Sequence, residues 1–199
     1  YETNLPVGQY TDLKVSPPCG IASEEMILGD LDEPIHLLSP QRVRAQLLWF
    51  GEGYVEYTLP SYLREGQTLT DIEIIGEFGS ETAGFNDNWP SLIQVALNGK
   101  PICNFTTPGD FGSTRGSLTP KWWPNNQYGI LVIIRINSDG VMVNGEYRSD
   151  VTTKDFLPLK DKWKLRFSVA EQAKGGGFTL FGEKFGNYAQ DVCFREYYR

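Results

Sequence analysis

Hydrophobic and polar residues alternate with a period of two along much of the chain. The segment 162–169 reads KWKLRFSV, with an apolar side chain at every second position. This pattern predicts a strand with one buried face and one face in water. Similar alternation marks 54–59 and 72–78, whereas the continuous apolar run at 131–134 predicts a central strand covered on both sides.

Turn-forming pairs separate these strand-like segments. Glycine after asparagine or aspartate supplies the positive backbone φ angles that tight hairpins require. Three such pairs stand between apolar stretches: Asn98-Gly99, Asp139-Gly140 and Asn144-Gly145. Because tight hairpins join antiparallel neighbours, and parallel strands need long crossovers, we expect antiparallel sheets.

Helical signals are few and short. Ser39 followed by Pro40 is typical of a helix start, and the segment 151–157 suits a single helical turn. We therefore expect nine or ten strands and no helix longer than two turns. The predicted fold is an all-β, antiparallel β-sandwich of jelly-roll type that occupies residues 1–199 as one domain, with a barrel as the alternative.

Composition narrows the class of protein. The chain has 199 residues, 40% of them hydrophobic and 22% charged, which is ordinary for a folded domain with one sizeable core. Its formal net charge is −7, whereas nucleic-acid binding depends on an excess of lysine and arginine that face phosphates. We therefore expect no direct contact with DNA or RNA. No apolar run suits a membrane span. Cys19, Cys103 and Cys193 lack paired spacing, which predicts free thiols in a cytoplasmic protein.

Catalytic and metal-binding patterns are weak. His36 is the one histidine and no nucleophile motif surrounds it, so a histidine-based relay is not expected. Asp30, Asp32 and Glu33 offer oxygens to a hard cation, but their spacing is more typical of an acidic turn than of a calcium loop. We expect no metal, no cofactor and no enzymatic activity. Carboxylates for glycoside chemistry stay open as an alternative: Glu52, Glu56, Glu73, Glu77 and Asp110.

Three glycine-rich loops, 78–90, 108–129 and 174–188, are dense in aromatic residues. Flat rings beside amides and carboxylates suit a polyhydroxylated ligand, because the rings cover C–H faces while the polar groups bond hydroxyls. The candidate ligand-binding residues are Asn86, Asp87, Trp89, Asp110, Arg115, Trp122 and Trp123. The competing interpretation is that the two adjacent tryptophans cap the open end of the sandwich. Neighbours on an extended chain point to opposite sides, so one of the pair is expected in the core and the other in solvent.

Five stretches resemble a known family. They are PVGQYTDLKVSPPCGIAS, QLLWFGEGYVEYTLPSYL, NDNWPSLIQVALNG, PGDFGSTRGSLTPKWWPNNQYGIL and FTLFGEKFGNYAQDVCFR. Together they resemble the C-terminal β domain of bacterial ArsR-like transcriptional regulators, common in Firmicutes, from about residue 5 to residue 198. The resemblance implies a winged helix-turn-helix domain ahead of Tyr1, and the acidic charge of this chain and its start at a tyrosine fit that expectation. The metal-sensing cysteines of classical members lie in the helical domain, so the resemblance implies no metal site here.

The sequence therefore predicts the ligand-sensing or dimerisation half of a regulator that contacts DNA through another domain. Its expected partner is a small molecule, carbohydrate-like in chemistry. Arg115 would fork onto a carboxylate or a hydroxyl pair of that ligand, and the tryptophans would stack on it. Three alternatives stay open: a stand-alone carbohydrate-binding module, a carboxylate-based glycoside-active enzyme, and a purely structural domain that pairs two chains as a homodimer.

Overall fold

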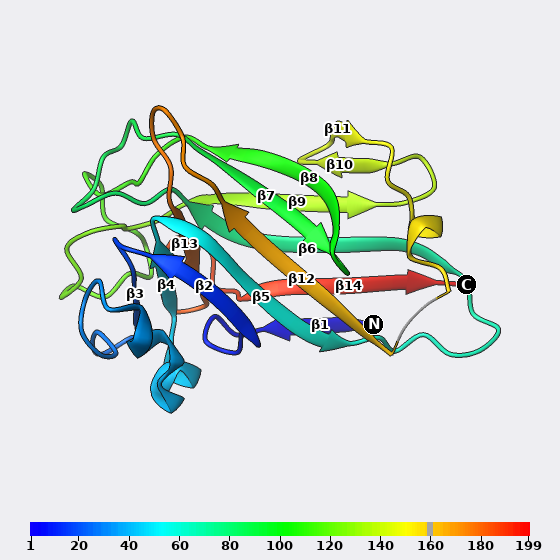
Figure 1. Ribbon diagram of the computed structural model, residues 1–199, viewed down its shortest axis with the longest axis horizontal. Coiled ribbons are helices and arrows are strands. Elements are labelled where there is room, and N and C mark those ends of the chain that lie inside the picture. The colour runs from blue at the N-terminus through cyan, green and yellow to red at the C-terminus, as the bar shows by residue number, and fades with distance from the viewer. Residues whose placement is uncertain (159–160) are drawn as a thin grey trace.

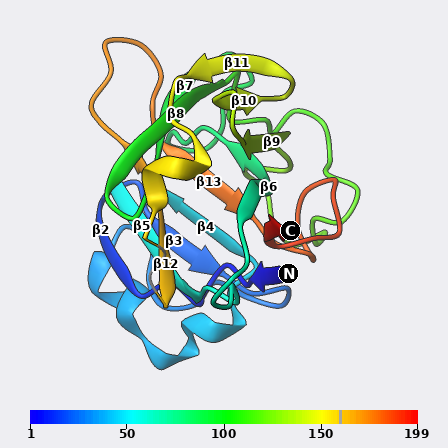
Figure 2. The same cartoon turned by 90° about the vertical axis from the view of Figure 1, so that its right-hand side faces the viewer.

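The alternating segments form two antiparallel sheets, stacked face to face, in the computed structural model, which describes residues 1–158 and 161–199 (Figures 1 and 2). Nine of the described strands make the larger sheet: β1 (Glu2–Leu5), β3 (Gly20–Ala22), β4 (Leu47–Phe50), β6 (Leu69–Gly79), β9 (Ile130–Ile136), β10 (Val141–Val143), β11 (Glu146–Ser149), β13 (Phe178–Phe181) and β14 (Val192–Tyr198). Five make the smaller sheet: β2 (Asp12–Ser16), β5 (Glu52–Pro60), β7 (Ser91–Leu97), β8 (Lys100–Thr107) and β12 (Lys162–Val169). The predicted antiparallel β-sandwich is confirmed.

The chain crosses repeatedly between the two sheets, in the manner of a jelly roll. Strand β6 is central to the larger sheet, with β9 on one side and both β13 and β14 on the other. The smaller sheet has the order β2-β5-β12-β7-β8. The described residues contain fourteen strands, more than the nine or ten predicted, because several strands of three to five residues are too short to show an alternating pattern.

Local sequence signals account for most of the boundaries. The predicted strand at 162–169 coincides with β12, and β7 and β8 turn at Asn98 and Gly99, whose φ angles are 51° and 80°. Helical structure in the described chain is limited to three short 3₁₀ segments, Pro34–Leu38, Pro40–Arg44 and Thr153–Phe156. No helix among the described residues is both long and apolar enough to cross a membrane.

Strand β9 departs from its prediction. The continuous apolar run was expected to be covered on both faces, but only alternate residues, Val132, Ile134 and Ile136, are buried. Ile133 between them is 38% exposed. The two sheets form only two layers, so the outer face of β9 meets solvent although β6 and β10 flank the strand.

Aromatic rings fill the space between the sheets. Phe78 of β6 packs against Phe167 of β12 at 5.0 Å between ring centroids, and against Phe178 of β13 at 6.0 Å. A second, smaller apolar cluster lies apart from this core and is built from Ala22, Leu47, Trp49, Trp123, Phe181 and Phe185. Because one of its members comes from the loop 108–129, that loop contributes to the folded interior.

Candidate functional site

The three aromatic loops meet at one end of the sandwich. The backbone amide of Asn86 donates to the Asp110 carbonyl, and the amide of Asp110 donates back to the Asn86 carbonyl, both at 3.0 Å. The amide of Leu118 donates to the Gly186 carbonyl at 2.8 Å, which ties in the third loop. We call the end formed by residues 78–90, 108–129 and 174–188 the loop pole; it lies at the left of Figure 1.

The adjacent tryptophans separate as the sequence predicted. Trp123 is 2% exposed, and its Nε1 donates to the Asn126 carbonyl at 3.0 Å. Its ring lies 5.1 Å from that of Trp49 in the smaller apolar cluster. Trp122 is 40% exposed and donates its indole N–H to the Glu24 carbonyl at 2.8 Å. Trp123 therefore plugs the loop pole from inside and offers no ring face on which a ligand could stack.

Arg115 and Asp110 hold the loops together. The Arg115 guanidinium donates to the carbonyls of Trp123 at 2.9 Å and Pro120 at 2.7 Å, so both of its terminal nitrogens are bonded to the backbone. Asp110 is 1% exposed, and its Oδ2 accepts the Thr82 amide at 3.2 Å. The prediction that Arg115 donates two hydrogen bonds to a ligand does not fit this geometry, because its N–H groups already donate to backbone carbonyls of the turn.

Asn86 and Asp87 are exposed but serve the loop backbone. Asp87 Oδ1 accepts the amides of Gly112 at 3.0 Å and Ser113 at 3.3 Å, and hydrogen bonds from Ser113 and Gly112 lower the pKa of its carboxyl. Asn86 Oδ1 accepts the amide of Asn88 at 2.9 Å. Both side chains brace adjoining turns, so of the seven candidates Trp89 and Trp122 keep the most ring surface.

Glu81 is the acid that the sequence did not single out. It follows β6 within the loop pole and is 6% exposed. One oxygen, Oε2, accepts a hydrogen bond from the side-chain amide of Asn126. The other oxygen, Oε1, makes no hydrogen bond to any residue that the structure describes, and it is not among the fully buried atoms. A mostly buried carboxyl group that keeps one oxygen accessible and without a protein partner beside a hollow is a candidate for contact with a ligand.

Burial also changes the acidity of this carboxyl group. It raises the pKa of Glu81 well above its ordinary 4.5, and the nearby charge of Asp110 raises it further. Burial likewise raises the pKa of Asp110 from 3.8 to about 7. The raised pKa favours the neutral form of Glu81, and a neutral carboxyl group can donate a hydrogen bond as well as accept one.

A hollow of about 150 Å³ opens beside Glu81. Trp49 and Trp123 form its apolar wall, and Asn125, Asn126 and Asp32 supply polar groups. The remaining lining residues are Pro18, Leu31, Ala83 and Gly84. We call this the Glu81 hollow. Its residues come from three separate loops, so a ligand there would touch all of them.

A second hollow of about 190 Å³ lies next to the first and shares Pro18 and Glu81 with it. Its most prominent ring is Trp89, so we call it the Trp89 hollow. The Trp89 indole donates to the backbone carbonyl of Glu81 at 3.1 Å. The same residue therefore fixes the ring and supplies the acid.

A glycine run makes this close packing possible. Gly177 has a φ of +73°, and a Cβ there would lie 2.4 Å from the Glu81 carbonyl oxygen. A Cβ on Gly175 would lie 1.7 Å from the Pro90 carbonyl oxygen. The segment can cover Glu81 only because these positions lack side chains.

Of the other proposed carboxylates, Glu52 lines the Trp89 hollow, whereas Glu77 and Glu56 have structural roles. Glu77 was expected on a wet strand face, but it is buried and accepts backbone amides from Gly129, Asn187 and Tyr188 at 2.9 to 3.0 Å. Glu56 is buried against Arg166, with 2.8 Å between Oε2 and Nε. Within residues 1–158 and 161–199, no group of three or more acidic, histidine or cysteine side chains is arranged to hold a metal ion.

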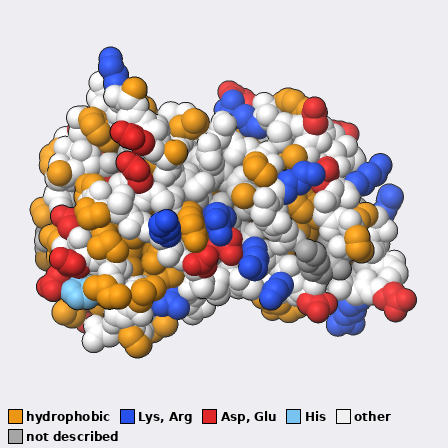
Figure 3. All heavy atoms as spheres, viewed as in Figure 1, with side chains coloured by type: hydrophobic (Ala, Val, Ile, Leu, Met, Phe, Trp, Pro, Cys, Tyr) orange, Lys and Arg blue, Asp and Glu red, His pale blue; other side chains and the backbone are white. Residues whose placement is uncertain are grey.

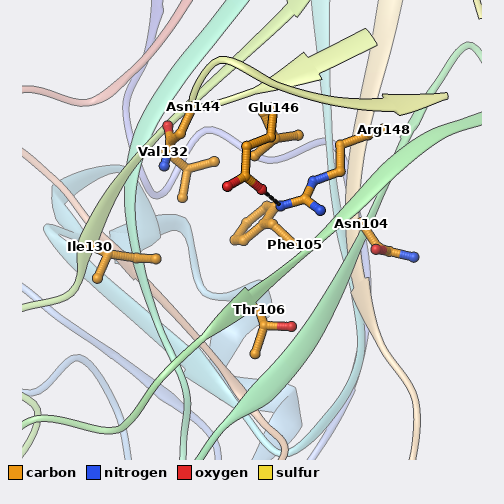
Figure 4. Close-up of a pocket in the computed structure, with 9 residues that line it drawn as sticks. Asn104, Phe105, Thr106, Ile130, Val132, Asn144, Glu146 and Arg148 are labelled. Atoms are coloured by element: carbon orange, nitrogen blue, oxygen red, sulfur yellow. Dashed lines mark hydrogen bonds and ion pairs between the residues drawn. The ribbon is translucent and has the colours of Figure 1, made fainter.

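A larger hollow of about 270 Å³ lies away from the loop pole, between β8 and the β9–β11 region (Figure 4). Phe105 and Val132 form part of its apolar floor. Arg148 and Glu146, two residues apart on β11, pair with each other beside it, with 2.8 Å between their charged atoms. We call it the Arg148 groove; each of its charges is already compensated by the other.

Exposed apolar side chains gather elsewhere, over the 3₁₀ segments near the loop pole (Figure 3). Ile35, Leu38 and Val43 are each at least 60% exposed. This surface lies on the 3₁₀ segments and not on a sheet face. The expectation of a homodimer stays a prediction.

Comparison with known proteins gives no family. No family model matches the chain, and no curated protein matches it. One similar solved structure is the carbohydrate-binding module CBM36 in complex with calcium and xylotriose, at 9% identity and a TM-score of 0.39, covering 98% of this chain and 99% of that one. Another is a family 7 alginate lyase in complex with product, at 10% identity and a TM-score of 0.28, covering 92% and 100%. These likenesses concern general architecture alone. The resemblance to ArsR-like regulators stays a prediction.

Proposed function

We propose that this chain is a ligand-binding domain of an ArsR-like bacterial transcriptional regulator and that a small polyhydroxylated, sugar-like molecule binds in the Glu81 hollow. The observation that carries the proposal is the unengaged Oε1 of Glu81, on a residue that is 6% exposed and lines this hollow. A hydroxyl group of the ligand could form a hydrogen bond with this oxygen, which would give both groups a partner.

The surrounding residues suit such a ligand. The side-chain amides of Asn125 and Asn126 offer both donors and acceptors, and the edges of Trp49 and Trp123 offer apolar contact for C–H groups. Stacking on a full indole face is not part of this proposal, because both rings are almost completely buried.

A signal would arise from the loops that the ligand joins. The Glu81 hollow takes residues from the loops around 18–32, 81–84 and 123–126. A ligand that binds one arrangement of these loops more tightly than another shifts the population toward it. The attached DNA-binding domain would respond to that shift.

The test is a thermal-shift and calorimetric screen of monosaccharides against wild type and two variants. Glu81→Gln should weaken binding of any stabilising sugar by about tenfold or more, because an amide nitrogen replaces one of the two carboxyl oxygens. Glu146→Gln, the matched change in the Arg148 groove, should leave affinity within about twofold. Loss of binding in Glu146→Gln and not in Glu81→Gln would contradict the proposal.

Two alternatives use the same site. A stand-alone carbohydrate-binding module differs only in what is attached to the chain, so the full-length gene decides between it and the regulator. A glycoside-active enzyme is favoured by the raised pKa of Glu81, which suits a general acid, with Asp32 in the same hollow as the second carboxylate. Turnover of chromogenic glycosides, lost in Glu81→Gln, would support the enzyme over the binding domain.

A further inference from the structure

The Glu81 hollow and the Trp89 hollow share two residues, Pro18 and Glu81. From this shared lining we infer that the loop pole binds an uncharged ligand of two linked sugar rings, with one ring in each hollow and Glu81 between them. The inference rests on the proposed function and narrows it from a sugar-like molecule to a neutral disaccharide or the end of a longer chain.

Size supports a two-part ligand. Ligand pockets commonly measure about 300 to 1,000 Å³. The hollows measure about 150 Å³ and about 190 Å³, so each alone falls below that range and the two together reach its lower end. A single ring would leave one of them filled only by water.

The two hollows offer complementary surfaces. The rings that wall the Glu81 hollow, Trp49 and Trp123, are almost fully buried, so this side supplies mainly polar contact through Asn125 and Asn126. Trp89 in the other hollow is only partly buried and can cover a sugar C–H face. Its indole N–H is bonded to the Glu81 carbonyl, so the ring is held in place before a ligand arrives.

Charge excludes an acidic ligand. The exposed carboxylates of Glu52 and Glu171 line the Trp89 hollow, and that of Asp32 lines the other. Neither hollow has a lysine or an arginine among the described residues that line it. A sugar acid or a sugar phosphate would meet unpaired like charges, whereas the hydroxyl groups of a neutral sugar would donate hydrogen bonds to these carboxylate oxygens.

The experiment is a set of titrations followed by tryptophan fluorescence and calorimetry. The probes are glucose with cellobiose and maltose, galactose with lactose, and xylose with xylobiose, together with glucuronic acid. At least one disaccharide should bind about tenfold or more tightly than its monosaccharide, and glucuronic acid should bind more weakly than glucose. Trp89→Ala should remove the gain from the second ring while the monosaccharide keeps its affinity within about twofold, and Trp89→Phe should retain part of the gain.

A second variant protects the test against misfolding of Trp89→Ala. Glu171→Lys changes an exposed side chain at the rim and should improve binding of glucuronic acid severalfold without weakening the neutral disaccharide. If monosaccharides bind and no disaccharide binds more tightly, or if glucuronic acid binds best to the wild type, the inference is wrong and the proposed function stands. If no probe binds the folded protein, both are wrong.

Discussion

The Arg148 groove is the largest of the hollows compared above, yet the smaller Glu81 hollow is the better candidate site. In the groove, Arg148 and Glu146 neutralise each other at 2.8 Å, and both side chains are well exposed. In the Glu81 hollow, an acid that is 6% exposed keeps one oxygen without a partner among the described residues. Volume alone therefore does not identify a binding site. A mostly buried polar group with an atom that lacks a protein partner is the stronger indication of one.

The two regions also differ in what holds them. The groove is bounded by regular strands, β8 to β11, which are held mainly by hydrogen bonds between backbone groups. The loop pole depends on side chains: the Arg115 guanidinium on turn carbonyls, the Asp87 carboxylate on loop amides, and the Trp123 indole in the apolar cluster. The pole should therefore be more sensitive to mutation.

The largest expected effect is that of removing Trp123. Trp123→Ala should lower the free energy of unfolding by about 3 to 5 kcal/mol, because it leaves a cavity in the apolar cluster under the Glu81 hollow. Trp122→Ala is the control, and it should cost about 1 kcal/mol or less because that ring is partly in solvent. Urea denaturation of both variants measures the difference. Equal losses would contradict the separation of the two tryptophans.

The next effect is a dependence of stability on pH that comes from the loop pole. Burial raises the pKa of Asp110 from 3.8 to about 7, so the folded state holds a proton that the unfolded chain releases. The free energy of unfolding should therefore fall as pH rises from about 4 to about 7, by up to about 4 kcal/mol for this group. Glu81 and Asp87 face Asp110, and the raised pKa of Glu81 acts in the same direction.

Asp110→Asn sharpens this prediction. Asparagine can still accept the Thr82 amide, so the variant should fold and should be at least as stable as wild type at pH 8. Its unfolding free energy, measured by urea titration at several pH values, should vary less between pH 4 and pH 7. Wild type and variant with the same slope would show that Asp110 titrates normally in the folded state.

The smallest effect is expected at the Arg148 groove. Arg148→Ala breaks an exposed ion pair and should change the free energy of unfolding by no more than about 0.5 kcal/mol. A higher salt concentration should reduce the difference in unfolding free energy between this variant and wild type, because salt screens exposed ion pairs. Denaturation at low and high salt checks it, and a loss comparable to that of Trp123→Ala would reverse the comparison between the two regions.

Much of the fold could be predicted because its strands and turns are determined by short stretches of sequence. Alternation located β12 to the residue, and Asn98-Gly99 located the β7–β8 turn. Aromatic density also indicated three loops, and the Asn86–Asp110 pairing shows that two of them meet.

Glu81 could not be predicted in the same way. It stands in the polar stretch GSETAG, where a glutamate is normally solvated. Its burial depends on Asn126 and on the glycine run that includes Gly177, which lie 45 or more residues away along the chain. The available signal was the run of three glycines at 175–177, which indicates close approach of backbone but does not say to what. Arg115 and Asp110 were predicted to bind a ligand because their side chains are charged. In the folded chain these charged groups instead form hydrogen bonds to the backbone of the loops.

The most direct test of the Glu81 site is a ¹H–¹⁵N correlation spectrum recorded while cellobiose, maltose, lactose and xylobiose are titrated in turn. The indole signals of Trp49, Trp89 and Trp123 and the side-chain amide signals of Asn125 and Asn126 report on the two joined hollows. The side-chain amides of Asn104 and Asn144 report on the Arg148 groove. We predict that a binding sugar shifts the first set and leaves the second unchanged; shifts confined to Asn104 and Asn144 would contradict the assignment of the site to Glu81.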